Sequence, residues 1–263
     1  MAGDERVGGL LLGDARAMFA AMSALRNRIQ GNLQRLRDSI ESVCARCGRR
    51  PQEITLVAVT KSAELDAIKA AVEAGLTQLG ESRVQQLIER AGQLAAWLQA
   101  RGDQARAPRV RCHMVGHLQR NKVKAVLGAV EVIHSVDSLR LAEEINLRAE
   151  RAGRTIDVLI QVNCSQERQK FGCAVGAAIH LTELVSTLKN LRLLGLMTMG
   201  PLAGGPEAAR PAFARLRELF EEMRNEKIGG ADFRHLSMGM SQDCPVAIEE
   251  GATILRIGSA IFD

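Results

Sequence analysis

The fold is decided by residues 54–80, which read ITLVAVTKSAELDAIKAAVEAGLTQLG. Residues 54–59 form a short apolar run rich in β-branched side chains, which predicts a buried strand. Residues 65–73 carry apolar side chains at helical spacing, and Gly75 ends that predicted helix. Residues 78–80 then predict a second strand. A strand, a helix and a strand in this order make up a parallel βαβ unit.

The same alternation continues to the end of the chain. We predict six further strands, at residues 112–115, 132–136, 156–162, 191–197, 235–237 and 253–257. Each strand but the last is followed by a helical pattern, and continuous apolar runs are typical of a parallel sheet buried on both faces. Eight such units predict an α/β protein with a single (β/α)8 TIM barrel, and a doubly wound open sheet is the alternative. No GxGxxG follows a predicted strand, so a dinucleotide site has no support.

Upstream of the barrel, residues 17–47 predict one amphipathic helix. Apolar side chains recur there every three or four positions, and the opposite face is rich in arginine. Gly48 and Pro51 end this predicted helix. Residues 1–16 have no clear period, so we expect a disordered extension followed by one barrel domain, residues 17–263, that includes the helix.

Composition excludes several classes of function. Among the 263 residues there is no apolar run of 18, so we expect no membrane span and a cytoplasmic protein. The 6 cysteines do not resemble a disulfide framework. The net charge of +5 comes without interleaved aromatic side chains, so nucleic-acid binding is not expected. Cys44 and Cys47 have zinc-like spacing but no second pair, and we expect no metal site.

Lys61 is the first candidate site residue. In a (β/α)8 barrel the active site lies at the carboxyl ends of the strands, and Lys61 follows the first buried strand directly. We therefore expect it to be partly desolvated, and burial favours the neutral amine that forms an imine with a carbonyl group. The alternative is a lysine that reaches solvent at the barrel rim, and Lys122 and Lys170 are rivals near other strand ends.

The loops after the last two strands form the second candidate feature. Residues 236–241 read LSMGMS and residues 256–259 read RIGS. Small residues leave backbone N–H groups accessible and hydroxyl groups add donors, in the two loops where this barrel usually binds phosphate. The alternative is that Gly239 and Gly258 only form tight turns. A ligand with a carbonyl for Lys61 and a phosphate for these loops is indicated, and pyridoxal 5′-phosphate has both groups.

Arg256 lies in the eighth predicted strand and is expected to point into the barrel beside the pyridine ring. A permanent cation there would keep the pyridine nitrogen unprotonated, which weakens the cofactor as an electron sink. A simple salt bridge with an acid of the barrel is the alternative.

Motifs spread over residues 25–262 resemble those of one protein family. They lie at residues 56–61, 80–81, 115–119, 121–122, 133–138, 195–197, 236–241 and 251–262. The family is that of the pyridoxal phosphate homeostasis proteins, which are similar to the barrel domain of alanine racemase standing alone. The resemblance implies a barrel of the pyridoxal-phosphate-dependent fold type III kind.

The resemblance also implies roles for individual residues. Lys61 would hold the cofactor as a Schiff base, and Arg256 would face the pyridine nitrogen. The phosphate would be bound by Ser237, Ser241, Gly258 and Ser259. Met238 and Met240 would line the pocket. Ser82 stands near the cofactor where the family has an asparagine, and the shorter side chain offers no amide.

By resemblance, the function is to hold pyridoxal phosphate and to act in vitamin B6 and amino-acid homeostasis without substrate turnover. Its partners would be the cofactor and apo-enzymes that depend on it, and the chain would be a monomer or a weak homodimer. A two-base racemase of this fold takes a tyrosine from a C-terminal β domain, whereas this sequence ends after the eighth strand and contains no tyrosine. The alternatives are a weak racemase-like enzyme with Lys61 as sole base, and an interaction protein that docks a partner or nucleic acid through the N-terminal helix.

Overall fold

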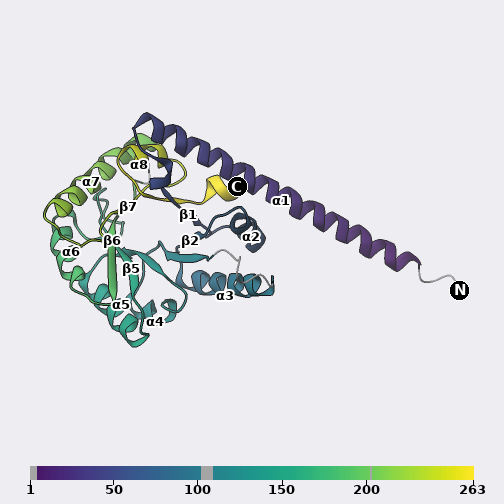
Figure 1. Cartoon of the computed structure of the whole chain (residues 1–263), viewed down its shortest axis with the longest axis horizontal. Helices are drawn as coiled ribbons and strands as arrows, with labels where there is room; N and C mark the ends of the chain where they lie inside the picture. The colour runs from purple at the N-terminus through teal and green to yellow at the C-terminus, as the bar shows by residue number, and fades with distance from the viewer. Residues whose placement is uncertain (1–4, 102–108, 202) are drawn as a thin grey trace.

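The computed structural model describes residues 5–101, 109–201 and 203–263, with side chains from residue 18 onward, and it contains a closed parallel barrel (Figure 1). Each strand among the described residues pairs in parallel with its neighbours in sequence, and the first pairs with the eighth. The strands are β1 (Thr55–Val59), β2 (Gln78–Glu81), β3 (Arg111–Met114), β4 (Val132–Val136), β5 (Ile156–Gln161), β6 (Leu191–Met197), β7 (His235–Ser237) and β8 (Ile254–Ile257). The predicted (β/α)8 barrel is confirmed, and the open sheet is wrong.

Helices cover the outside of the barrel, one after each of the first seven strands. They are α2 (Leu65–Glu73), α3 (Val84–Ala100), α4 (Val123–Val126), α5 (Leu139–Arg151), α6 (Ala178–Ser186), α7 (Arg210–Asn225) and α8 (Cys244–Glu249). Single turns of 3-10 helix lie at Pro51–Glu53, Arg120–Lys122, Val175–Ala177 and Pro206–Ala209. A short helix, α9 (Ser259–Phe262), follows β8, where the sequence predicted none, because four residues are too few to show a helical period.

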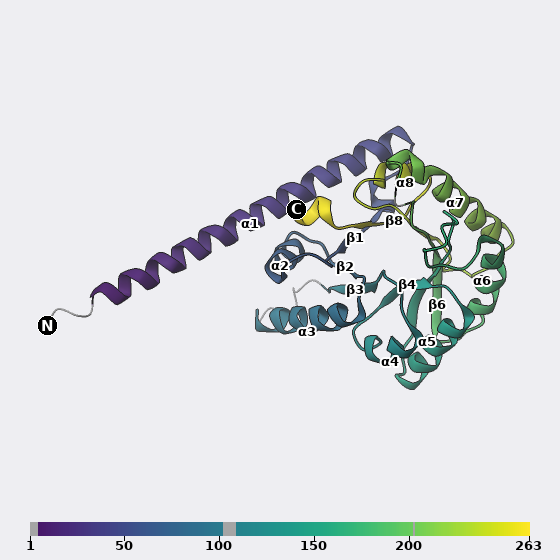
Figure 2. The same ribbon diagram turned by 180° about the vertical axis from the view of Figure 1, so that it is seen from behind.

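The N-terminal helix is present as α1 (Glu5–Arg46). Its second half packs on α2, α8 and α9 through buried side chains such as Ile29 and Leu33. The Asn32 amide donates to the carbonyl oxygens of Ile261 and Asp263, at 2.9 Å each. The first half extends away from the barrel (Figures 1 and 2).

The helix begins earlier than the sequence analysis expected. Residues 5–16 continue α1, although we expected a disordered extension there, and no proline interrupts the helical hydrogen bonding in this stretch. Residues 1–4 lie outside the described residues. The division of the chain after residue 16 stays a prediction.

The core has an apolar layer between sheet and helices, and a barrel interior that is partly polar. Seven buried apolar side chains form a separate interior cluster: Val57, Val115, Val132, Leu159, Leu194, Met197 and Ile254. His134 on β4 and Ser237 on β7 hydrogen-bond to each other across the barrel, so both point inward. Within the described part of the chain, no helix is both long and apolar enough to cross a lipid bilayer.

Candidate ligand-binding site

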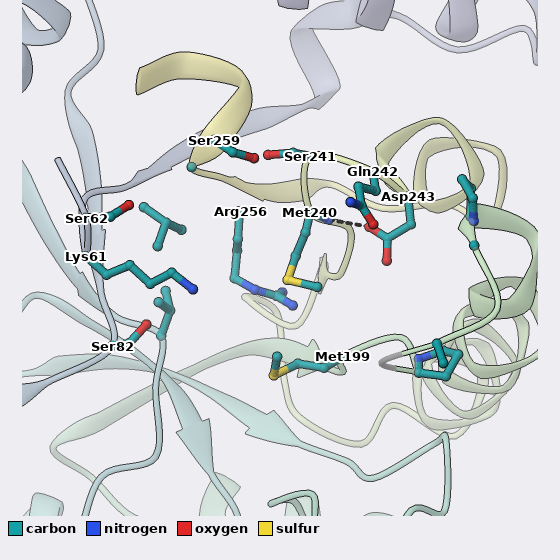
Figure 3. Close-up of a pocket in the computed structure, with 17 residues that line it drawn as sticks. Lys61, Ser62, Ser82, Met199, Met240, Ser241, Gln242, Asp243, Arg256 and Ser259 are labelled. Atoms are coloured by element: carbon teal, nitrogen blue, oxygen red, sulfur yellow. Dashed lines mark hydrogen bonds between the residues drawn. The ribbon is translucent and has the colours of Figure 1, made fainter. Parts of the chain in front are cut away.

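A pocket of about 370 Å³ opens at the carboxyl ends of the strands (Figure 3). Its size is in the range of pockets that hold a small organic molecule. The lining comes from β8 itself and from the segments that follow β1, β2, β3, β6, β7 and β8. It includes Lys61, Ser62, Ser82, Val115, Met199, Pro201, Met240, Ser241, Gln242, Asp243, Arg256, Gly258 and Ser259. The pocket is therefore at the end of the barrel where the sequence predicted the site.

Lys61 lies on one wall of this pocket and extends toward Arg256 (Figure 3). Its side chain is exposed, so the expected partial burial is wrong. The physical reason is that β1 ends at Val59, which places Lys61 two residues beyond the strand, where the pocket is open.

The two rival lysines are placed elsewhere in the described structure. Lys122 is exposed at the end of a 3-10 turn. The Lys170 ammonium contacts the Gly200 carbonyl and the Glu167 carboxylate. Neither side chain is part of the pocket wall formed by the described residues, whereas Lys61 is.

Arg256 forms the floor of the pocket and is only 5% exposed. Its guanidinium donates to the Ser237 hydroxyl at 2.7 Å and to the Thr198 carbonyl at 2.8 Å. Among the described residues it forms no ion pair, so the salt-bridge alternative has no support. Burial lowers the pKa of Arg256 to about 10, although the charge of nearby Asp243 acts in the opposite direction. The side chain is therefore a buried cation at neutral pH, and its hydrogen-bond partners are neutral.

Ser237 and Met238 do not reach the pocket wall, so Ser237 does not lie with the other residues that were expected to bind the phosphate. Ser237 is completely buried beneath Arg256, and its hydroxyl also lies 2.9 Å from Nδ1 of His134. Met238 is completely buried in the apolar layer outside the barrel, so the expectation that it lines the pocket is wrong. Successive side chains of a strand point to opposite faces, so Met238 points outward when Ser237 points inward. Met240 lines the pocket as expected.

The predicted phosphate loops meet at one end of the pocket. The Ala260 N–H donates to the Ser241 hydroxyl at 3.3 Å, and Ser259 faces Ser241 from the start of α9 (Figure 3). A Cβ atom on Gly258 would lie 3.1 Å from the Val59 carbonyl oxygen, which is tighter than usual contact. The structure thus brings Ser241, Gly258 and Ser259 together.

The alternative interpretation of these loops, that a glycine only forms a tight turn, fits Gly239. Gly239 has φ +94°, and a Cβ atom there would lie 2.5 Å from Cβ of Ala247. This position therefore needs glycine for the turn itself. Gly239 does not line the pocket in the described structure, and it acts by bringing Met240 and Ser241 to the wall.

Ser82 lines the wall on the side of Lys61 (Figure 3), and it follows an acidic residue at the end of β2. Glu81 is buried, and burial raises the pKa of its carboxyl group. One carboxyl oxygen hydrogen-bonds to the Thr60 hydroxyl, and the other has no hydrogen-bond partner among the described residues. Because Thr60 precedes Lys61, this bond ties the end of β2 to the backbone that carries the lysine.

The sequence analysis missed Asp243. Its carboxylate accepts the Met240 N–H at 2.5 Å, which fixes the loop after β7. Asp243 directly precedes α8, and an aspartate followed two residues later by a proline, as at Pro245, is a usual helix-start signal that could have identified it. Among the described residues, no group of three or more histidine, cysteine, aspartate or glutamate side chains could hold a metal ion.

Known proteins match both the sequence and the structure. The family model for "Alanine racemase, N-terminal domain" matches residues 31–263. The chain is 39% identical over 230 residues to the pyridoxal phosphate homeostasis protein of Aquifex aeolicus (strain VF5), covering 88% of this chain and 95% of that protein. The protein of the same name from Escherichia coli (strain K12) is 34% identical over 241 residues, with 90% and 96% coverage. PipY of Synechococcus elongatus PCC7942, solved with PLP bound, is 29% identical with a TM-score of 0.75, covering 90% of this chain and 100% of that chain.

Proposed function

The chain belongs to the family of the pyridoxal phosphate homeostasis proteins, and from this premise we propose that its pocket binds pyridoxal 5′-phosphate. One observation carries the proposal. A lysine amine and a buried guanidinium without a carboxylate partner share one pocket with a cluster of hydroxyl groups at its other end. The amine matches the aldehyde of this cofactor, the guanidinium matches its pyridine nitrogen, and the hydroxyl groups match its phosphate.

Each group of the cofactor has a matching donor or nucleophile in this chain. Ser241, Ser259 and the backbone around Gly258 would hold the phosphate. Arg256 would donate to the pyridine nitrogen, and Ser82 would offer a hydroxyl beside the ring. Lys61 would supply the amine that reacts with the aldehyde of the cofactor, and the C=N bond would form with loss of the aldehyde oxygen as water.

The protein's role is to hold the cofactor in vitamin B6 and amino-acid homeostasis, without substrate turnover. Arg256 supports this role because a guanidinium can only donate to the pyridine nitrogen and cannot protonate it fully at neutral pH. An unprotonated ring is a poor electron sink, so the carbanion chemistry of amino-acid enzymes is disfavoured. The recipients of the cofactor would be apo-enzymes that depend on it.

Titration of the cofactor-free protein with pyridoxal phosphate tests the binding. We expect wild type to develop a visible absorption band and Lys61→Ala to lack it. Lys61→Ala should still bind the cofactor through the phosphate contacts, but with an affinity lower by about ten-fold or more. A double variant, Ser241→Ala with Ser259→Ala, should also bind more weakly than wild type. The exposed Lys122→Ala is the matched control and should behave as wild type. A wild-type protein that does not bind the cofactor overturns the proposal.

Turnover is tested separately on the loaded protein. Each common amino acid is incubated with wild type and with Lys61→Ala, and the enantiomers are separated by chiral chromatography. We expect no difference between the two proteins. Racemisation by wild type alone would replace the carrier role with the weak racemase-like activity.

A further inference from the structure

A continuous chain of hydrogen bonds runs through the barrel interior from the pocket floor to the amino-terminal end of β2. Arg256 lies 2.7 Å from the Ser237 hydroxyl, which lies 2.9 Å from Nδ1 of His134. Nε2 of His134 lies 2.8 Å from Nδ1 of His113, and Nε2 of His113 lies 2.8 Å from Oε1 of Gln78. The five side chains come from β8, β7, β4, β3 and β2, so the chain crosses the whole barrel.

When both imidazoles are neutral, the two ends of this chain fix the position of every proton in it. A guanidinium can only donate, so the Ser237 oxygen accepts from Arg256 and its single hydrogen is free to go to Nδ1 of His134. His134 must then carry its hydrogen on Nε2 and donate it to Nδ1 of His113. His113 carries its own hydrogen on Nε2 and donates it to Oε1 of the Gln78 side chain. The two neutral imidazoles are therefore in the same tautomer, with the hydrogen on Nε2.

The environment of the two histidines agrees with this proton pattern. His134 is 0% exposed and His113 is 3% exposed. Burial lowers the pKa of His113 to about 3, with a further contribution from the charge of Arg111. Burial also lowers the pKa of His134 well below its usual value, and His113 and Arg256 act in the same direction. A protonated His134 would direct an N–H at a hydroxyl that already accepts from Arg256.

We infer that His134 and His113 are positioning residues that hold Arg256, through Ser237, as the hydrogen-bond donor at the pocket floor. Arg256 has no carboxylate to orient it among the described residues, and its side-chain acceptor is the Ser237 hydroxyl. Because His134 takes the hydroxyl hydrogen, the Ser237 lone pairs stay directed at the guanidinium. Each bond in such a chain polarises the next, which makes Ser237 a better acceptor for a cation than an isolated hydroxyl.

The chain itself is tested in the cofactor-free, full-length protein by NMR with ¹⁵N-labelled histidine. Both rings are expected to be neutral Nε2–H tautomers from about pH 5.5 to 8, around the usual titration range of histidine. The Arg256 guanidinium hydrogens are expected to exchange slowly with water in wild type, and fast in Ser237→Ala and His134→Leu. An Nδ1–H tautomer, a protonated ring or unchanged exchange in both variants overturns the inference.

The role toward the ligand rests on the proposed function and is tested with a matched pair of variants. Ser237 and Ser135 are both completely buried, but the Ser135 hydroxyl has no hydrogen-bond partner among the described residues. Ser237→Ala should weaken pyridoxal phosphate binding by about ten-fold or more and shift the absorption band of the bound cofactor, while Ser135→Ala should do neither. His134→Leu should reproduce the Ser237→Ala effect, and the two changes together should add little, since both break one chain.

These outcomes separate the two proposals. Wild type that fails to bind the cofactor overturns the proposed function, and the NMR experiment still decides whether the chain orients Arg256. Normal cofactor binding that is unaffected by Ser237→Ala overturns the positioning role. If His134→Leu does not fold, the serine pair alone gives the same decision.

Discussion

Arg256 is a buried cation, and we propose that its position serves ligand binding at a cost in stability. Taking a charge out of water without a counter-ion is unfavourable, and the two neutral acceptors offset only part of that cost. We expect Arg256→Met to leave the free energy of unfolding unchanged or to raise it by about 1–2 kcal/mol, while cofactor affinity falls by about ten-fold or more. Urea unfolding and cofactor titration measure the two quantities.

The matched control for this prediction is Arg192→Met. Arg192 forms a two-pronged ion pair with Asp157, whose side chain is 5% exposed. Its removal leaves a buried carboxylate with fewer partners, so we expect a loss of about 1–3 kcal/mol and unchanged cofactor affinity. A loss of stability in Arg256→Met as large as in Arg192→Met would contradict the account of Arg256.

For single residues, the sequence predicted which types of side chain line the pocket better than it predicted where each side chain points. Lys61 and Arg256 stood out because each carries a charge at the end of, or within, an apolar strand. Met238 was assigned to the pocket by the family resemblance, which names residues but does not show which face of the strand each one occupies. Ser237 and Met238 are neighbours, and neighbouring side chains of a strand point to opposite faces, so the two residues could not both line one pocket.

The loop after β7 is the element on which the pocket depends most. Gly239 has a positive φ and no room for a Cβ atom beside Ala247. We expect Gly239→Ala to lower the free energy of unfolding by about 1–3 kcal/mol and to weaken cofactor binding, because Met240 and Ser241 would shift. Urea unfolding at constant pH measures the first effect.

Gly92 in α3 is the control for this substitution. A Cβ atom there meets nothing within 4 Å, and alanine favours the helix more than glycine does. Gly92→Ala should therefore stabilise the protein by up to about 1 kcal/mol and leave binding unchanged. Equal effects of the two substitutions would show that the geometry of the Gly239 turn is not important.

Helix α1 is expected to contribute unequally along its length. Leu33 is completely buried, so Leu33→Ala should cost about 2–5 kcal/mol of unfolding free energy. Deletion of residues 1–16 should change the free energy of unfolding by less than about 0.5 kcal/mol, because those residues precede the part of α1 that packs on the barrel. A deletion that costs as much as Leu33→Ala would contradict the proposed division of the chain.

Most of the elements could be predicted because the longer strands, such as β1 and β6, are mostly apolar runs that alternate with helical patterns. β4, β6 and β7 have the bounds that the sequence predicted, and the other strands differ by a residue or two. The start of α1 and the presence of α9 could not be predicted, since one lacks a hydrophobic period and the other is a single turn. The sequence also predicts a polar loop at residues 100–108, and residues 102–108 of it lie outside the described residues.

The whole molecule should lose stability as pH falls below neutrality. His113 and His134 have pKa values lowered from 6.5 in the folded protein, to about 3 for His113, and burial also lowers the pKa of His235. Below about pH 6.5 the unfolded chain binds protons at these histidines that the folded protein does not bind. The free energy of unfolding is therefore highest above this pH and falls as the pH is lowered toward about 3. Between about pH 7.5 and 5.5 we expect a loss of about 2–4 kcal/mol by urea unfolding.

A substitution at an exposed histidine controls this measurement. His180 is exposed on α6, so His180→Asn should show the same loss of stability as wild type. Glu81, whose pKa burial raises, acts in the opposite direction, because its folded form binds a proton that the unfolded chain has released. A stability that is constant or rises toward about pH 5.5 would contradict the neutral histidine pair.

Closure of the barrel was predictable from the count of alternating units, but the hydrogen-bond chain through its interior was not. The partners of that chain come from five strands that are distant in sequence, and only the three-dimensional register brings them together. The sequence therefore predicted where the pocket lies, and the structure was needed to show what holds its floor.

The most direct test of the central claim is to load the protein with pyridoxal phosphate, reduce it with borohydride and map the modified peptide by mass spectrometry. Reduction converts the C=N bond to a stable C–N bond, so the label records which amine held the cofactor. The account predicts a yellow protein with a single pyridoxyl group on Lys61. A label on Lys122 or Lys170, or a protein that stays colourless and unlabelled, would contradict it.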